Sequence, residues 1–68
     1  MKQNVKKQVD FYRVSYYNPI DDGKIYTVDG FSYKFEAGFL QTLNNQGKAT
    51  FVIPNVNVIQ IAGVCYND

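Results

Sequence analysis

The sequence contains no histidine and no tryptophan, and its single cysteine is Cys65. Without histidine the chain lacks the commonest general base at neutral pH and any nucleophile activated by an imidazole. A lone cysteine forms neither an internal disulfide nor a dithiol redox pair, and it leaves zinc without its usual ligands. The sequence therefore predicts a protein that is not an enzyme and that holds no cofactor or metal.

Glycines and acidic residues are too scattered for most ligand chemistry. The five glycines stand alone, so the chain has no glycine-rich phosphate loop. Asp21 and Asp22 are neighbours, but a hard cation needs more oxygen ligands at wider spacing. We interpret them as part of a turn that ends at Gly23, and we interpret Asp29 and Glu36 as solvated acids. No small-molecule substrate is expected.

Long apolar runs are also missing. No run approaches the roughly 18 residues of a membrane-spanning helix, and the lysine-rich start is not followed by an apolar stretch of signal-peptide length. One cysteine and no Asn-x-Ser/Thr site favour a reducing compartment, so we expect a cytoplasmic protein that does not act at a membrane. Abundant Asn, Ile, Lys, Phe and Tyr fit AT-rich coding DNA, which favours a low-GC bacterium or one of its phages as the source.

Residues that favour strands are plentiful. Six tyrosines and five phenylalanines accompany many β-branched residues, whereas Ala, Leu and Glu number only three, two and one. The expected strands span residues 9–17, 24–28, 31–36, 39–43, 48–53 and 58–61. Asn18 to Gly23 is a strong turn signal, and Asp29-Gly30 is either a tight hairpin turn or a bulge within a longer strand.

Alternation within these strands predicts which side chains face inward. In the first strand the more apolar face carries Tyr12, Val14 and Tyr16, which we assign to the core. In the third strand one half-buried face carries Phe31, Tyr33 and Phe35.

Short strands at intervals of about 8 to 12 residues are typical of a small barrel or sandwich. An optional N-terminal helical turn, a bent second strand and a 3₁₀ turn at Asn55–Asn57 before a short closing strand resemble the architecture of SH3-like and Lsm-like small barrels. No family motif accompanies this resemblance. We predict an all-β antiparallel barrel of five or six strands over residues 9–64, with a basic tail or short helix at 1–8 and a tail at 65–68.

Six tyrosines exceed what a core of this size needs, because a buried tyrosine hydroxyl requires a hydrogen-bond partner. Tyrosine is also enriched at protein interfaces. The candidate binding residues are Tyr12, Arg13, Tyr16, Tyr26, Tyr33 and Lys34. Alternate strand positions face opposite ways, so these residues cannot all share one surface, and Tyr33 has an alternative place in the core.

Two functions compete. The first is a protein-binding or self-assembling module in which a closing strand, Val58–Val64, pairs with another chain. Another protein or a further copy of the chain is then the partner, and a phage accessory protein that sterically occludes a host or viral protein fits the size. The alternative is single-stranded nucleic-acid binding through tyrosine stacking and scattered Lys and Arg. A net charge of +1 and a single arginine favour the first.

Overall fold

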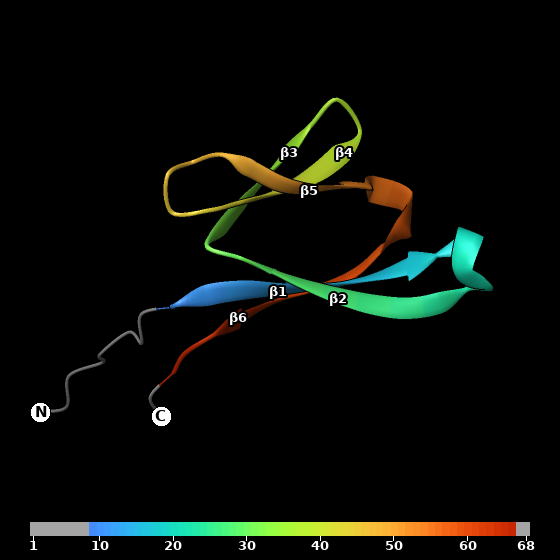
Figure 1. Cartoon of the computed structure of the whole chain (residues 1–68), viewed down its shortest axis with the longest axis horizontal. Coiled ribbons are helices and arrows are strands. Elements are labelled where there is room, and N and C mark those ends of the chain that lie inside the picture. The colour runs from blue at the N-terminus through green and yellow to red at the C-terminus, as the bar shows by residue number, and fades with distance from the viewer. Residues whose placement is uncertain (1–8, 67–68) are drawn as a thin grey trace, which may run out of the picture.

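The computed structural model describes residues 9–66 and shows an all-β arrangement with two single-turn 3₁₀ helices (Figure 1). The elements are β1 (Phe11–Asn18), η1 (Pro19–Asp21), β2 (Lys24–Gly30), β3 (Ser32–Glu36), β4 (Phe39–Leu43), β5 (Ala49–Pro54), η2 (Asn55–Asn57) and β6 (Val58–Val64). The predicted tail or helix at residues 1–8, and the last two residues of the predicted C-terminal tail, lie outside the described residues.

The six strands form two antiparallel three-stranded sheets. Sheet A has the order β2-β1-β6 and sheet B the order β3-β4-β5, and sheet B lies over one face of sheet A (Figure 1). Sheet B is a meander of consecutive strands, whereas sheet A combines the first hairpin with the last strand. The prediction of an all-β antiparallel chain is confirmed. Among residues 9–66 no strand of one sheet pairs with a strand of the other, so closure into a barrel is not confirmed.

The turn between β1 and β2 follows from its local sequence. The side chain of Asn18 accepts a hydrogen bond from the backbone N–H of Ile20 at 3.1 Å, and Pro19 supplies the fixed φ that suits the first position of η1. Asp22 and Gly23 then adopt left-handed φ values of 58° and 72°, which reverse the chain into β2. The turn predicted from Asn18 to Gly23 is therefore confirmed.

The chain passes from sheet A to sheet B just after Gly30. β2 continues to Gly30, which pairs with Tyr12, so Asp29-Gly30 does not form a tight hairpin. A side chain is excluded at Gly30 because a Cβ there would lie 2.8 Å from the Cβ of Thr42. The backbone N–H of Phe31 donates to the carbonyl oxygen of Leu43 at 2.8 Å, which aligns β3 beside β4. The predicted alternative of a bulge within a longer strand is also not found, because β2 keeps a regular register with β1 through Asp29 and Gly30 and ends there.

The core between the sheets is small. Its buried hydrophobic side chains are Val14, Leu40 and Ile53, and the buried Thr42 shares a 2.8 Å hydrogen bond with the hydroxyl of Thr50. The partly buried side chains packed against this centre are Tyr16, Val28, Tyr33, Val58 and Ile61. The inward face predicted for the first strand is confirmed by Val14 and Tyr16.

Three details differ from the sequence-based expectation. The first strand begins at Phe11 rather than at residue 9, and β6 continues to Val64 rather than ending at Ile61, because Phe11 pairs with Val64. Of the three aromatic residues assigned to one half-buried face, only Tyr33 packs against the core. Phe31 and Phe35 are 57% and 54% exposed, since both lie beyond the small area that the two sheets cover together.

Candidate functional site

The four tyrosines among the predicted binding residues form two ring pairs. Tyr16 lies opposite Tyr26 across β1 and β2, and their rings meet edge-to-face with centroids 6.0 Å apart. Tyr12 meets the ring of Tyr33 edge-to-face at 5.0 Å and so joins sheet A to sheet B. Such pairs add stability beyond the area that they bury. These rings flank the core, and Tyr26, 37% exposed, is the one most open to solvent.

The two predicted cations lie apart from these rings. Because β1 alternates, Arg13 projects from the opposite face to Val14, where its Nε and Nη2 atoms donate to Asp29 at 2.9 and 3.2 Å. The hydrogen bond from Arg13 lowers the pKa of Asp29 below its usual value and raises that of the guanidinium. The Nζ atom of Lys34 lies 3.1 Å from Glu36. The structure therefore does not bring the six predicted residues to one surface, and both cations already have acidic partners.

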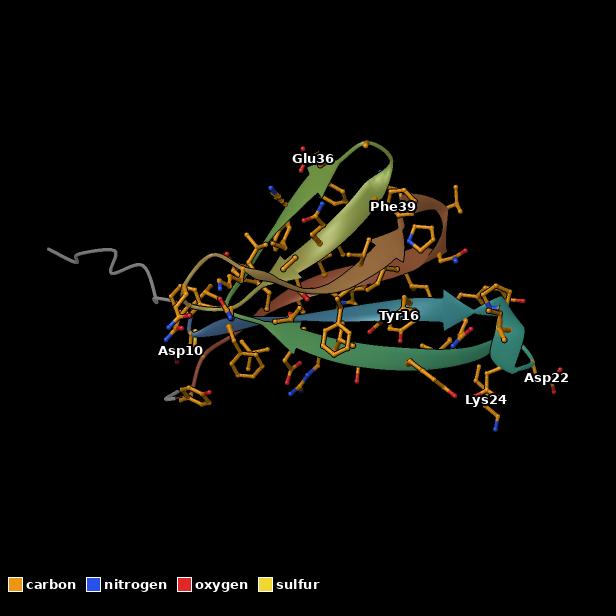
Figure 2. All side chains as sticks on the ribbon, turned by 45° about the horizontal axis from the view of Figure 1, so that its top comes forward. Asp10, Tyr16, Asp22, Lys24, Glu36 and Phe39 are labelled. Atoms are coloured by element: carbon orange, nitrogen blue, oxygen red, sulfur yellow. The ribbon has the colours of Figure 1, made fainter. Side chains whose placement is uncertain are left out.

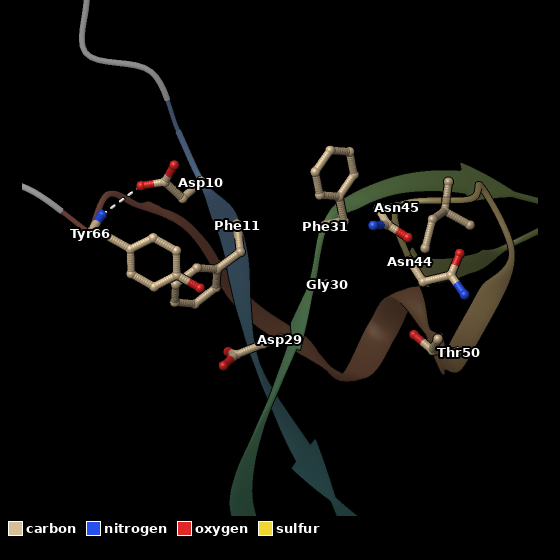
Figure 3. A pocket seen from close by; sticks show the side chains of 10 residues that line it. Asp10, Phe11, Asp29, Gly30, Phe31, Asn44, Asn45, Thr50 and Tyr66 are labelled. Carbon is tan, nitrogen blue, oxygen red and sulfur yellow. Dashed lines mark hydrogen bonds between the residues drawn. The ribbon is translucent and has the colours of Figure 1, made fainter.

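Two open cavities lie at opposite ends of β1. The first, of about 420 Å³, is called the terminal cavity; it is bordered by Asp10, Asp29, Phe31 and Tyr66 among others (Figure 3). Its polar groups are largely occupied by one another. Asp10 accepts a 2.6 Å hydrogen bond from the backbone N–H of Tyr66, and the side chain of Asn44 accepts two hydrogen bonds at 2.9 Å within its own turn.

Ring contacts further close one side of the terminal cavity. The rings of Phe11 and Tyr66 lie 5.4 Å apart, and the guanidinium of Arg13 lies 5.3 Å from the centre of the Phe11 ring. Asp29, which also borders the cavity, is held by Arg13. These contacts fasten the end of β6 to the start of β1, and they leave few groups that need an external ligand.

The second cavity, of about 380 Å³, is called the groove and lies between η1 and the β5–η2 segment. Its walls include Tyr16, Ile20, Phe51, Ile53 and Pro54, and none of its lining residues is charged. Figure 1 shows η1 and η2 at the same end of the molecule, far from the labelled N and C ends. Figure 2 shows the charged side chains of Asp22 and Lys24 beyond η1, outside the groove.

Several apolar side chains in and beside the groove are exposed. Ile20 of η1, which lines the groove, is 93% exposed, and the lining residues Phe51 and Val52 of β5 are 47% and 57% exposed. Val56, next to the lining residue Asn57 in η2, is 90% exposed. Single exposed apolar residues are ordinary, but a contiguous apolar surface around a groove is typical of an interaction site. This groove and its flanking side chains form the candidate site.

Sequence reasoning named only one residue of this site, Tyr16, among the candidate binding residues. It placed Ile20 and Val56 in turns and Phe51 in the expected strand at 48–53, without a functional role for any of the three. A signal was nevertheless present, because an isoleucine within Asn18–Gly23 and a valine between Asn55 and Asn57 are apolar residues in segments that otherwise favour polar ones.

Other site chemistry is not found in the described part of the chain. Residues 9–66 contain no group of three or more His, Cys, Asp or Glu residues arranged to hold a metal ion. Within the same range, no helix has both the length and the apolar character needed to cross a membrane. Comparisons with protein-family models, curated proteins and solved structures found no match.

Proposed function

We propose that this protein is a non-catalytic protein-binding module that receives an apolar segment of a partner protein in the groove between η1 and η2. The observation that carries this proposal is an uncharged groove whose lining includes the almost fully exposed Ile20, with the equally exposed Val56 next to the lining residue Asn57. Removing apolar surface from water is the main favourable contribution to most protein association. A partner segment that covers these side chains therefore gains affinity from their burial.

The walls of the groove suit a short extended segment. Tyr16 and Phe51 offer ring surfaces, which provide large contact area for little loss of side-chain entropy. Asn18 and Asn57 place amide groups among the apolar walls, where they can orient the backbone of a bound segment by hydrogen bonds.

Single-stranded nucleic-acid binding, the alternative, requires cations beside the stacking surfaces to contact phosphates. The groove residues include no cation, and Arg13 and Lys34 are each paired with an acid. These contacts favour a protein partner. The proposal extends to a phage accessory protein that sterically occludes a surface of a host or viral protein. The small size of the chain and an amino-acid composition that fits AT-rich coding DNA support this extension.

The SH3-like arrangement is also part of the proposal. It is supported by the β1–β2 hairpin, the strand that bends between sheets after Gly30, the β3-β4-β5 meander and the 3₁₀ turn directly before the last strand. An experimental structure with backbone hydrogen bonds between the two sheets would support the barrel, and one with two separate sheets would remove that part of the proposal.

A displayed library of random peptides provides the test, because the natural partner is not needed. We compare the wild type with the double variant Ile20→Ser/Val56→Ser and with the matched control Ile25→Ser, since Ile25 is 63% exposed on β2 and outside the groove. Peptides with apolar or aromatic anchors are expected to bind the wild type and the control. Binding to the double variant is expected to fall at least tenfold, about 1.4 kcal/mol.

Three results would contradict the proposal: no enrichment of any peptide, equal binding to the double variant, or loss of binding in the control. A labelled oligothymidine serves as the competing probe. If it binds the wild type and is released by raised salt, while no peptide is enriched, the nucleic-acid function replaces the proposed one.

A further inference from the structure

The two sheets present four outer strands, and one of them carries neither a charged residue nor a proline. β2 and β6 form the edges of sheet A, and β3 and β5 form those of sheet B. Edge strands expose unpaired backbone N–H and C=O groups, and natural proteins block them with charges, prolines, bulges or short length. β2 carries Lys24 and Asp29, β3 carries Lys34 and Glu36, and β5 ends in Pro54. β6 has seven residues, none charged and none proline.

The side chains of β6 add to this exposure. Val58 and Ile61 pack against the core and anchor the strand to β1. Ile59 is 53% exposed and lies at the register shift between β1 and β6, whereas the residues from Gln60 to Val64 pair with β1 in regular register and form the edge without a bulge. In residues 9–66, β6 pairs with β1 alone. Its outer edge thus combines unpaired backbone groups with a nearby exposed isoleucine. An added strand would supply hydrogen bonds to these backbone groups and cover part of the isoleucine side chain.

We propose that β6 pairs antiparallel with β6 of a second copy, so that two copies of sheet A become one six-stranded sheet. A two-fold axis sets the same strand against itself in reverse direction. Because Val58–Val64 has no charged residue, this pairing brings no like charges together. Self-pairing of β3 about its middle would instead place Lys34 against Lys34 of the copy, which is unfavourable.

The small core favours a second copy of the chain as the partner at the outer edge of β6. Only three hydrophobic side chains, Val14, Leu40 and Ile53, are buried in the described chain, so little apolar burial stabilises the single copy. Pairing adds a ladder of backbone hydrogen bonds and partly covers Ile59, and it stabilises the folded state by mass action as concentration rises. A six-stranded sheet is also of ordinary size, whereas three strands are at the low end. The pairing uses a different surface from the groove and stands independently of the proposed function.

Native mass spectrometry and sedimentation over a range of protein concentrations test the pairing. The variant is Ile59→Lys, since a lysine on an edge is a natural device against strand pairing. The matched control is Ile25→Lys, which makes the same change at a similarly exposed isoleucine on the opposite edge of sheet A. Wild type and control are expected to be dimers, with at least a tenfold weaker dimer in Ile59→Lys.

Amide hydrogen exchange of the wild type provides a second readout that needs no variant. Amides of β6 are expected to exchange more slowly at high than at low protein concentration, while those of β2 stay unchanged. If Ile59→Lys does not fold, as judged by circular dichroism, this comparison decides the question. Groove binding by Ile59→Lys, measured with a selected peptide, is expected to equal that of the wild type.

Several results would overturn the proposal. A wild type that stays monomeric at every concentration, or a dimer that Ile25→Lys disrupts and Ile59→Lys does not, excludes pairing through β6. Equal exchange of β6 amides at both concentrations excludes it as well. Open-ended oligomers without a dimer would show a head-to-tail contact instead of a two-fold one.

Discussion

The two cavities at the ends of β1 have similar volumes, about 420 and 380 Å³, but opposite chemistry. At the terminal cavity, polar groups satisfy one another through Asp10 with Tyr66 and Asp29 with Arg13. At the groove, uncharged walls continue into exposed aliphatic side chains such as Ile20. Cavity volume therefore does not identify a binding site in this protein. The better indicator is a surface whose side chains have no partner within the described chain, such as the exposed aliphatic side chains at the groove.

An added methyl group gives the largest expected contrast between the two ends. Gly30 borders the terminal cavity, and a Cβ there would lie 2.8 Å from Thr42 Cβ and 3.0 Å from the backbone oxygen of Ser32. Thr42 is 1% exposed and has no space to move. Gly30→Ala is expected to lower the free energy of unfolding by about 1–3 kcal/mol, measured by urea denaturation.

The matched change at the groove end is Val56→Ile, because Val56 is 90% exposed. Its effect on unfolding is expected to stay within about 0.5 kcal/mol. If Gly30→Ala and Val56→Ile lowered the free energy of unfolding by similar amounts, this would contradict the view that the terminal end is tightly packed and the groove end open.

A smaller effect is expected from Asp10→Ala, which removes the acceptor of the Tyr66 N–H group. Loss of one such hydrogen bond corresponds to about 1–1.5 kcal/mol, so the Tyr66 amide is expected to exchange about tenfold faster. Asp21→Ala, at the other end of sheet A, is the control and leaves this amide unchanged. Peptide binding in the groove is expected to survive both changes. An unaltered exchange rate in Asp10→Ala would show that the hydrogen bond does not hold this end together.

The smallest effect concerns the ion pair that borders the terminal cavity. The hydrogen bond from Arg13 keeps the folded-state pKa of Asp29 below its usual value; desolvation opposes this shift, and the positive charge of Arg13 adds a smaller lowering. A lowered pKa stabilises the fold above the unfolded-state pKa, and this contribution disappears as pH falls through the folded-state value. The stability difference between wild type and Asp29→Asn is therefore expected at pH 6, and it should disappear as the pH falls through the lowered folded-state pKa of Asp29.

Thermal unfolding across this pH range measures the difference. Both side chains of the pair are about half exposed, so added salt should reduce it further. Asp21→Asn provides the control for removal of one surface carboxylate. A difference that grows toward low pH would have the wrong sign for the Arg13–Asp29 pair.

Local patterns predicted much of the fold. Alternation along the first strand is sufficient to place Val14 inside and Arg13 outside, and the turn residues from Asn18 to Gly23 explain the first hairpin. The bend at Gly30 was not resolved from sequence, because a hairpin and a continuing strand have the same local signal. The close approach of Thr42 from the other sheet, which decides between them, is a tertiary contact.

The candidate site was harder to predict for the same reason. Tyr16 and Tyr33 were candidates both for the core and for binding, and the packing of one sheet on the other makes them neighbours of the core. Tyr16 also lines the groove. Ile20 and Val56 lie in short turns whose sequences indicate only loops. How exposed the two side chains are depends on how the two sheets pack against each other, which is a tertiary property. Sequence periodicity reports which face of a strand is apolar, but it does not report which apolar residues the fold leaves uncovered.

The order of strands along the chain has a consequence for synthesis. Sheet B is a continuous meander over residues 32–54, so it can form from neighbouring hairpins, whereas sheet A joins segments as distant as Asp10 and Tyr66, 56 positions apart. Contacts between such distant segments form late because a long loop must close first. On the ribosome, sheet A therefore stays two-stranded until β6 has emerged. The outer edge of β6 forms only after β6 has paired with β1. Nascent chains in which β6 has not yet been synthesised therefore cannot pair through this edge.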